Sequence, residues 1–184
     1  MTTLNQPETQ RLFITVELPP EALSALSQII HGLRASALGC VRLVATKNIH
    51  LTLKFLGDTD AVRISDLTAA LDGVAGRTTP FTLELGDVGG FPSLNRTRVM
   101  WVGLAGDMMS LDSLVDVIEE ACVALEFKAN AQPFSPHLTV ARMRDSAPPE
   151  ERRKAGEALT SLQWGKGVPV PIDSIKLFKS TLTP

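Results

Sequence analysis

Apolar positions along the chain switch between the two-residue spacing of strands and the three- to four-residue spacing of helices. The segment from Arg11 to Leu18 is rich in β-branched residues and stops at two prolines, which predicts a strand. From Pro20 onward, apolar residues recur at the spacing of one buried helix face. The same patterns predict strands at residues 41–44, 50–57, 81–88, 98–104 and 137–142, one or two last strands within residues 168–177, and helices at about 60–74, 108–125 and 148–162.

The order strand–helix–strand–helix–strand occurs twice, with no polar linker between the two copies. Such a repeat predicts an α+β protein with two pseudo-symmetric lobes, each a mostly antiparallel sheet with flanking helices. A doubly wound parallel sheet is disfavoured because no glycine-rich phosphate loop follows the first strand. We expect residues 1–10 to form a flexible N-terminal tail and residues 11–184 to form a single bilobal domain.

Composition limits how the protein can meet a partner. The 184 residues carry 18 basic and 20 acidic side chains, so no broad basic surface is available to grip long nucleic acid. Any RNA partner is therefore expected to be held locally, at an end or a single phosphate. The polar N-terminus lacks the features of a signal peptide, and no apolar run approaches the roughly 20 residues that span a bilayer, so we expect a cytoplasmic protein without membrane contact. Cys40 and Cys122 lie in apolar surroundings and are expected to be buried or partly buried free thiols.

Two of the three histidines begin nearly identical strings, His50-Leu-Thr-Leu and His137-Leu-Thr-Val, about half the chain apart. Residues two apart on a strand point to the same face, so each string presents an imidazole beside the hydroxyl of Thr52 or Thr139. One His-x-Thr string alone usually marks a half-buried histidine, whereas two copies in matching halves indicate function. A metal site is disfavoured because no Asp, Glu or Cys stands at strand spacing beside either string. His31 has no such partner motif and is expected to be an ordinary surface or boundary residue.

Two imidazoles and two hydroxyls in one cleft suit the opening of a phosphodiester. A neutral imidazole can take a proton from water while a protonated one gives a proton to the departing oxygen. The threonine hydroxyls can donate to the non-bridging oxygens, where negative charge gathers. This scheme requires neither a metal nor another cofactor. Lys54 shares the alternation of His50 and Thr52, which predicts its ammonium near the same pocket, the alternative being a solvated lysine.

These strings also carry a family resemblance. The chain resembles the RNA 2′,3′-cyclic phosphodiesterases, also called the 2′-5′ RNA ligase family, within the two-histidine phosphoesterase superfamily. The matching segments follow in order at residues 11–19, 48–57, 91–103, 133–142 and 177–180, which is nearly the whole chain. The resemblance implies a bilobal fold with the active-site cleft between the lobes. It also implies that an RNA 2′,3′-cyclic phosphate is converted to a 2′-phosphomonoester, so that the 3′ oxygen leaves.

The resemblance further implies roles for individual residues. His50 would be the proton donor to the leaving oxygen and His137 the proton acceptor that activates water, with Thr52 and Thr139 holding the phosphate. Among substrate-binding residues, Arg142 would lie near the phosphate, Phe13 would stack on the terminal base, and Arg96 and Arg98 would flank the cleft. The residues themselves leave open that Phe13 belongs to the core and that the two arginines are exposed loop charges. Strict alternation from His137 points Arg142 away from the cleft, so this role requires a bulge or the end of the strand to redirect it.

The expected partner is an RNA with a 2′,3′-cyclic phosphate end, tRNA fragments being one candidate source, and the expected state is a monomer. The same scaffold leaves open hydrolysis of a small cyclic phosphate, such as ADP-ribose 1″,2″-cyclic phosphate, and 2′-5′ ligation of RNA ends. A binding module that holds RNA ends without turnover is the alternative from another class. Family members commonly continue past the Leu177-Phe-Lys-Ser segment with a glycine and a tyrosine-bearing strand. This sequence stops at Pro184 and has no tyrosine, which indicates either a short form or a missing end.

Overall fold

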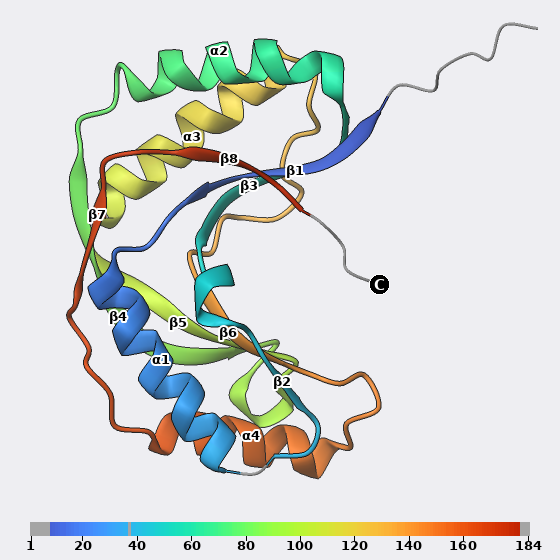
Figure 1. The fold of residues 1–184 in the computed structure, drawn as a ribbon, viewed down its shortest axis with the longest axis vertical. Helices are drawn as coiled ribbons and strands as arrows, with labels where there is room; N and C mark the ends of the chain where they lie inside the picture. Colours follow the sequence, from blue (N-terminus) through green and yellow to red (C-terminus); the bar gives the residue numbers. More distant parts are fainter. Residues whose placement is uncertain (1–7, 37, 181–184) are drawn as a thin grey trace, which may run out of the picture.

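Two antiparallel sheets organise residues 8–36 and 38–180, the part of the chain that the computed structural model describes (Figure 1). One is a three-stranded sheet with the order β3-β1-β8. The other is a five-stranded sheet with the order β2-β6-β5-β4-β7. The strands are β1 (Thr9–Val16), β2 (Val41–Leu43), β3 (Leu51–Asp60), β4 (Phe81–Phe91), β5 (Val99–Gly106), β6 (Leu138–Met143), β7 (Pro169–Ile172) and β8 (Lys176–Lys179).

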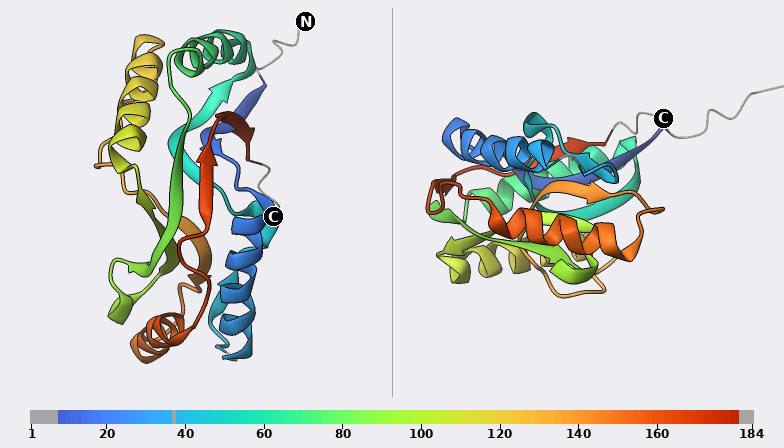
Figure 2. Two further views of the ribbon diagram at one scale, coloured as in Figure 1. Left: turned by 90° about the vertical axis from the view of Figure 1, so that its left-hand side faces the viewer. Right: turned by 90° about the horizontal axis from the view of Figure 1, so that it is seen from below.

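Helices cover each sheet and complete two lobes. The first lobe joins the three-stranded sheet to α2 (Ile64–Ala75) and α3 (Met108–Ala124), and the second joins the five-stranded sheet to α1 (Pro20–Ala35) and α4 (Pro149–Ser161). Figure 2 shows α2 and α3 at one end of the molecule and α1 and α4 at the other. The predicted α+β fold with two lobes is therefore confirmed.

The two halves of the sequence do not map onto the two lobes. α1 follows β1 in the sequence but packs on β2, β6 and β7 of the other sheet, and α3 follows β5 but packs on β3. The last strand, β8, returns to pair with β1 in the first lobe. Each lobe is thus built from both halves of the chain, and each still receives one histidine string, through β3 and β6.

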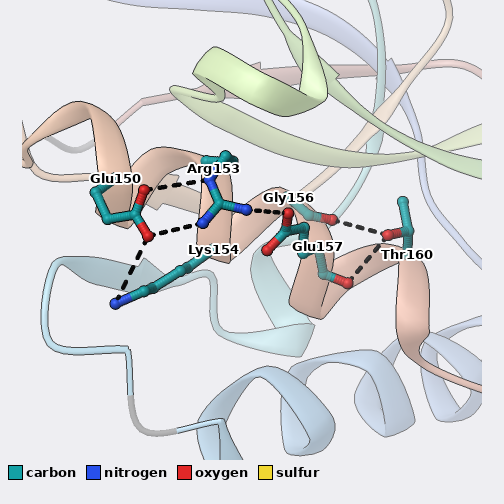
Figure 3. Close-up of polar contacts among 6 residues, drawn as sticks. All are labelled: Glu150, Arg153, Lys154, Gly156, Glu157 and Thr160. Carbon is teal, nitrogen blue, oxygen red and sulfur yellow. Dashed lines mark hydrogen bonds and ion pairs between the residues drawn. The ribbon is translucent and has the colours of Figure 1, made fainter.

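Local sequence explains how the helices begin and which faces they bury. α1 starts at Pro20, whose missing N–H costs nothing in the first turn, and buries Leu26, Ile29 and Leu33. α3 is capped by Asp107, whose carboxylate accepts from the Ser110 N–H at 3.1 Å. α4 keeps a charged outer face, on which Arg153 forms ion pairs with Glu150 and Glu157 (Figure 3).

The core is continuous across both lobes and includes one of the two thiols. Cys122 is fully buried, and burial raises the pKa of its thiol to about 11, while Cys40 is half-buried. Both are free, as predicted from their apolar surroundings. Among the described residues, no helix is both long and apolar enough to cross a membrane.

A few element boundaries differ from those predicted. β1 begins at Thr9, so residues 9 and 10 belong to the first strand instead of a tail, while residues 1–7 lie outside the described part of the chain. β4 continues to Phe91, through Gly89 and Gly90, beyond the predicted end of this strand at residue 88. Its pairing with β5 explains this difference, since Gly89 lies opposite Trp101 and the indole occupies the space that a side chain at Gly89 would fill.

Candidate active site

The first histidine string lies where the chain enters β3. His50 directly precedes the strand, and Thr52 lies opposite Thr15 on β1. The register then shifts by one residue at Leu53, so that Phe55 lies opposite Phe13. Because Phe13 and Thr15 are two residues apart on β1, Thr52 and Phe55 point to the same face of the sheet.

The prediction for Lys54 is wrong, and the bulge at Leu53 is the reason. One extra residue reverses the alternation, so Lys54 shares a face with buried Ile14 instead of with Thr52. Its side chain is 1% exposed, and its ammonium donates to the Glu119 carboxylate at 2.6 Å and to the Lys128 carbonyl at 3.0 Å. Lys54 therefore connects β3 to α3 and the segment that follows it.

The second string lies where the chain enters β6 and repeats this geometry. His137 directly precedes the strand, and Thr139 lies opposite Trp101 on β5. The register shifts by one residue at Val140, which returns Arg142 to the face of Thr139. The bulge that the prediction for Arg142 required is thus present, and the guanidinium side chain is exposed.

The two strings are equivalent position by position. Each places a histidine before the strand, a threonine on the open face, and a bulge at the fourth residue of the string. The residue that then returns to the threonine face is Phe55 in the first lobe and Arg142 in the second. The hydroxyls of Thr52 and Thr139 donate no hydrogen bond to another protein group within the described residues, which leaves them available to a ligand.

Each imidazole lies against a phenylalanine from another strand of the same sheet. His50 stacks on Phe13 with ring centroids 4.9 Å apart, and it meets Phe178 of β8 edge to face with ring centroids 5.9 Å apart. His137 meets Phe91 of β4 edge to face at 5.0 Å. Phe91 and Phe178 were not predicted as site residues, because their contacts with the histidines depend on pairing between strands that are distant in sequence.

Backbone carbonyls orient the imidazoles. Nδ1 of His137 lies 2.7 Å from the carbonyl oxygen of Ser135, two residues earlier. A carbonyl can only accept, so we assign the proton to Nδ1, which leaves Nε2 for a substrate. His50 also has a backbone hydrogen bond to the residue two positions earlier, Asn48. Burial lowers the pKa of His50 below its ordinary value of 6.5, and this hydrogen bond only partly opposes the shift.

A pocket of about 450 Å³ opens beside His50, between the three-stranded sheet and α1. Phe13, Phe178 and Leu23 are among its apolar walls, and its charged lining consists of Lys47, Lys179 and Glu17. Since α1 belongs to the second lobe, the pocket lies where the two lobes meet. Its apolar walls explain why the protonated form of His50 is disfavoured in the free protein.

His137 lies outside the lining of this pocket, but the topology leads both strings to the junction of the lobes. β2 runs antiparallel to β6, and the Val44 N–H just beyond β2 donates to the Val140 carbonyl at 2.9 Å. From Val44 the chain continues past the His137 end of β6 and reaches His50 after one short helical turn. In Figure 1 the chain enters β3 and β6 at the level where the lobes meet. No hydrogen bond or ring contact joins the two imidazoles in the described structure.

Three other arginines lie on or beside strands of the five-stranded sheet. Arg98, just before β5, shares a face with buried Met100, two residues later. Thr139 lies opposite Trp101 on the other face of β5, so the register does not place Arg98 beside Thr139. Arg96 is exposed in the short turn between β4 and β5. Arg42 on β2 lies directly opposite Arg142, and both are exposed. Sequence reasoning missed Arg42, because only the strand pairing brings it to the face of Thr139.

Comparison with known proteins identifies relatives along nearly the whole chain. A sequence profile of the 2′-5′ RNA ligase superfamily matches residues 19–181. The chain is 36% identical over 139 residues to an Escherichia coli RNA 2′,3′-cyclic phosphodiesterase, covering 73% of each protein. It is 35% identical over 170 residues to an RNA 2′,3′-cyclic phosphodiesterase of Geobacillus stearothermophilus, covering 92% of this chain but 52%, about half, of that relative.

Solved structures agree with the sequence relatives. A Thermus thermophilus protein superposes with a TM-score of 0.76 at 25% identity, over 95% of this chain and 90% of that one. Escherichia coli LigT in complex with 3′-AMP superposes with a TM-score of 0.68 at 27% identity, over 96% of this chain and 91% of that one. The chain belongs to the 2′-5′ RNA ligase superfamily.

Proposed function

We propose that this protein hydrolyses RNA 2′,3′-cyclic phosphate ends to 2′-phosphomonoesters, with the paired histidines as acid and base. The observation that carries the proposal is the equivalence of the two strings: each lobe offers one oriented imidazole and one available hydroxyl at the junction of the lobes. The names of the relatives, RNA 2′,3′-cyclic phosphodiesterases, support the substrate. Ends of this kind on tRNA fragments are one candidate source.

In the proposed reaction, His137 takes a proton from water through its free Nε2 as the water oxygen attacks phosphorus. The bond from phosphorus to the 3′ oxygen breaks, and His50 gives its proton to that oxygen. The product is a 2′-phosphate beside a free 3′ hydroxyl. His137 then carries the extra proton and His50 lacks one, so exchange with solvent must restore both before the next turnover.

The hydroxyls and one arginine hold the phosphate in this scheme. Thr52 and Thr139 donate to the two non-bridging oxygens, and Arg142, returned to the same face by the bulge, supplies positive charge. Phe13, which already stacks on His50, offers its surface to the terminal base. The assigned groups act without a metal.

Because the pKa of His50 is lowered in the free protein, binding of the substrate helps to protonate it. Burial favours neutral imidazole in the free protein, whereas a proton donor must be protonated. An anionic cyclic phosphate beside the ring would favour the charged form and raise its pKa again. His50 therefore acquires its proton most readily when the substrate is bound.

Identification of the product tests the proposed reaction. The EDTA-treated protein is incubated with a short RNA that ends in a 2′,3′-cyclic phosphate, and the product is separated as the 2′- or the 3′-phosphate. Undiminished conversion to the 2′-phosphate is expected. A 3′-phosphate would overturn the assignment of the leaving oxygen, and activity abolished by EDTA and restored by a divalent metal would overturn the metal-independent scheme.

A further inference from the structure

We propose that Phe55 is a stacking platform for the base of the second-to-last nucleotide, so that the preferred substrate is an RNA end of two or more nucleotides. This inference rests on the proposed function. Of the large apolar side chains that the described residues expose, Phe55 is the aromatic one, with 71% of its surface exposed. A phenylalanine in the middle of a strand is usually buried, so this exposure needs a physical reason.

The bulge at Leu53 accounts for where Phe55 points. Without it, regular alternation would put residue 55 on the face opposite to Thr52; with it, Phe55 lies on the threonine face, opposite Phe13. Phe13 in turn lies opposite Phe178, so the three phenylalanines form one row across β3, β1 and β8. The bulge thus places an aromatic ring on the open face of an edge strand.

Distances along this row indicate the path of a nucleic acid strand. The His50 ring lies 4.9 Å from Phe13, and Phe13 lies 6.1 Å from Phe55. Phe13 and His50 line the pocket, whereas Phe55 is outside it. A terminal base stacked on Phe13 keeps its cyclic phosphate near His50. The next base toward the 5′ end then reaches the ring of Phe55, which lies outside the pocket. Successive bases stack on successive aromatic side chains in proteins that bind single strands.

The charge of the chain favours stacking over electrostatic attraction as the source of affinity. With 18 basic and 20 acidic residues, the protein cannot rely on a broad cationic surface for the upstream nucleotides. Any base can stack on an aromatic ring, so such a platform adds affinity without requiring a particular sequence. The inference therefore predicts a preference for length over sequence.

The test compares a dinucleotide that ends in a 2′,3′-cyclic phosphate with the corresponding mononucleotide, 2′,3′-cyclic AMP. Phe55→Ala should lower kcat/KM on the dinucleotide by roughly tenfold, in line with the loss of one stacked base, and should lower it far less on the mononucleotide, which has no upstream base to stack. Phe55→Tyr should retain turnover, whereas Phe55→Leu, which is apolar but has no aromatic face, should behave like Phe55→Ala. Met109→Ala, at an 83% exposed position on α3, is the matched control and should change neither substrate.

A substrate that lacks the upstream base separates stacking from other effects. In the wild type, removal of the second-to-last base should cost as much as Phe55→Ala, and in Phe55→Ala the same removal should cost nothing further. The inference is overturned if the variant remains sensitive to the missing base, if the mononucleotide is affected equally, or if Phe55→Ala converts a dimer to a monomer in sedimentation.

Failure of the proposed function would be seen separately, as absence of wild-type turnover on every cyclic phosphate. In that case, equilibrium binding is measured for a 2′-phosphorylated dinucleotide with and without its upstream base. Stacking predicts that the wild type binds the form with the base more tightly and that Phe55→Ala binds both forms equally. Equal binding of both forms by the wild type would overturn it.

Discussion

Lys54→Met removes a buried charge from the contact between β3 and the segment that leads to His137. The wild-type ammonium lies 2.6 Å from Glu119 Oε2 and 3.0 Å from the Lys128 carbonyl oxygen. The other carboxylate oxygen, Oε1, accepts the Asn130 N–H at 2.7 Å. Methionine keeps much of the lysine stem's volume but cannot donate, so the variant leaves the carboxylate and the carbonyl without their shared partner.

The expected cost follows from the exposure of the two partners. Removing one member of a fully buried pair costs about 3–5 kcal/mol. Here the Lys54 side chain is 1% exposed, but that of Glu119 is 24% exposed, so water can rehydrate part of the carboxylate. We therefore expect the free energy of unfolding to fall by about 2–3 kcal/mol, a loss between that of one hydrogen bond to a charged group and that of one member of a fully buried ion pair.

Urea unfolding followed by circular dichroism measures this loss. In a Glu119→Met background, Lys54→Met should cost much less, because the charge partner is already gone. Hydrogen exchange at the Asn130 amide should accelerate in Lys54→Met, since the carboxylate that accepts this N–H is no longer held. A loss below about 0.5 kcal/mol, as for an ordinary surface substitution, would refute the reasoning.

The pH dependence gives an independent check on the same pair. Although burial opposes it, the hydrogen bonds from Lys54 and Asn130, with the lysine charge, lower the pKa of Glu119 below its ordinary value of 4.5. A carboxylate whose pKa is lower in the folded state contributes stability above its unfolded pKa and loses it as pH falls through the folded value. The stability gap between wild type and Lys54→Met should therefore narrow as pH falls below 4.5.

Two further predictions concern packing and the acid. A Cβ at Gly156 of α4 would lie 2.1 Å from the Leu94 carbonyl oxygen, so Gly156→Ala should lower the free energy of unfolding by about 1–3 kcal/mol in a thermal unfolding experiment. A Cβ at Gly73 of α2 would meet nothing within 4 Å, so Gly73→Ala should raise it by about 0.5–1 kcal/mol. Changes in the same direction for both variants would contradict this packing. Phe13→Ala should expose His50 to water and raise its lowered pKa toward 6.5. Because a proton donor is active only below its pKa, the alkaline limb of the kcat/KM profile should then move to higher pH. Movement of the acidic limb instead would make His50 the acceptor.

Much of the fold was predictable because hydrophobic spacing is a local signal. The predicted helices and strands are all present, with most boundaries shifted by a few residues. The assignment of elements to lobes was not predictable, since α1 and α3 pack on the sheet that does not contain the strand before them. That choice depends on pairing between distant strands, of which β1 with β8 is the extreme case.

For the site, the two His-x-Thr strings could be predicted from the sequence, whereas the two bulges could not. Alternation places Thr52 correctly but fails two residues later, where the shift at Leu53 turns Lys54 inward and Phe55 outward. The equivalent shift at Val140 makes Arg142 accessible to the site. Neither string contains a glycine or proline that would announce a bulge, so only the cross-strand register reveals which side chains share the open face.

Turnover by three single histidine variants tests the central claim most directly. His50→Ala and His137→Ala should each lower kcat on a cyclic-phosphate RNA by roughly 10²–10⁴-fold, the range for a proton-transfer role, while all variants remain folded by circular dichroism. His31→Ala, on the exposed face of α1, is the matched control and should match the wild type. Turnover within tenfold of wild type in either His50→Ala or His137→Ala would contradict paired-histidine catalysis.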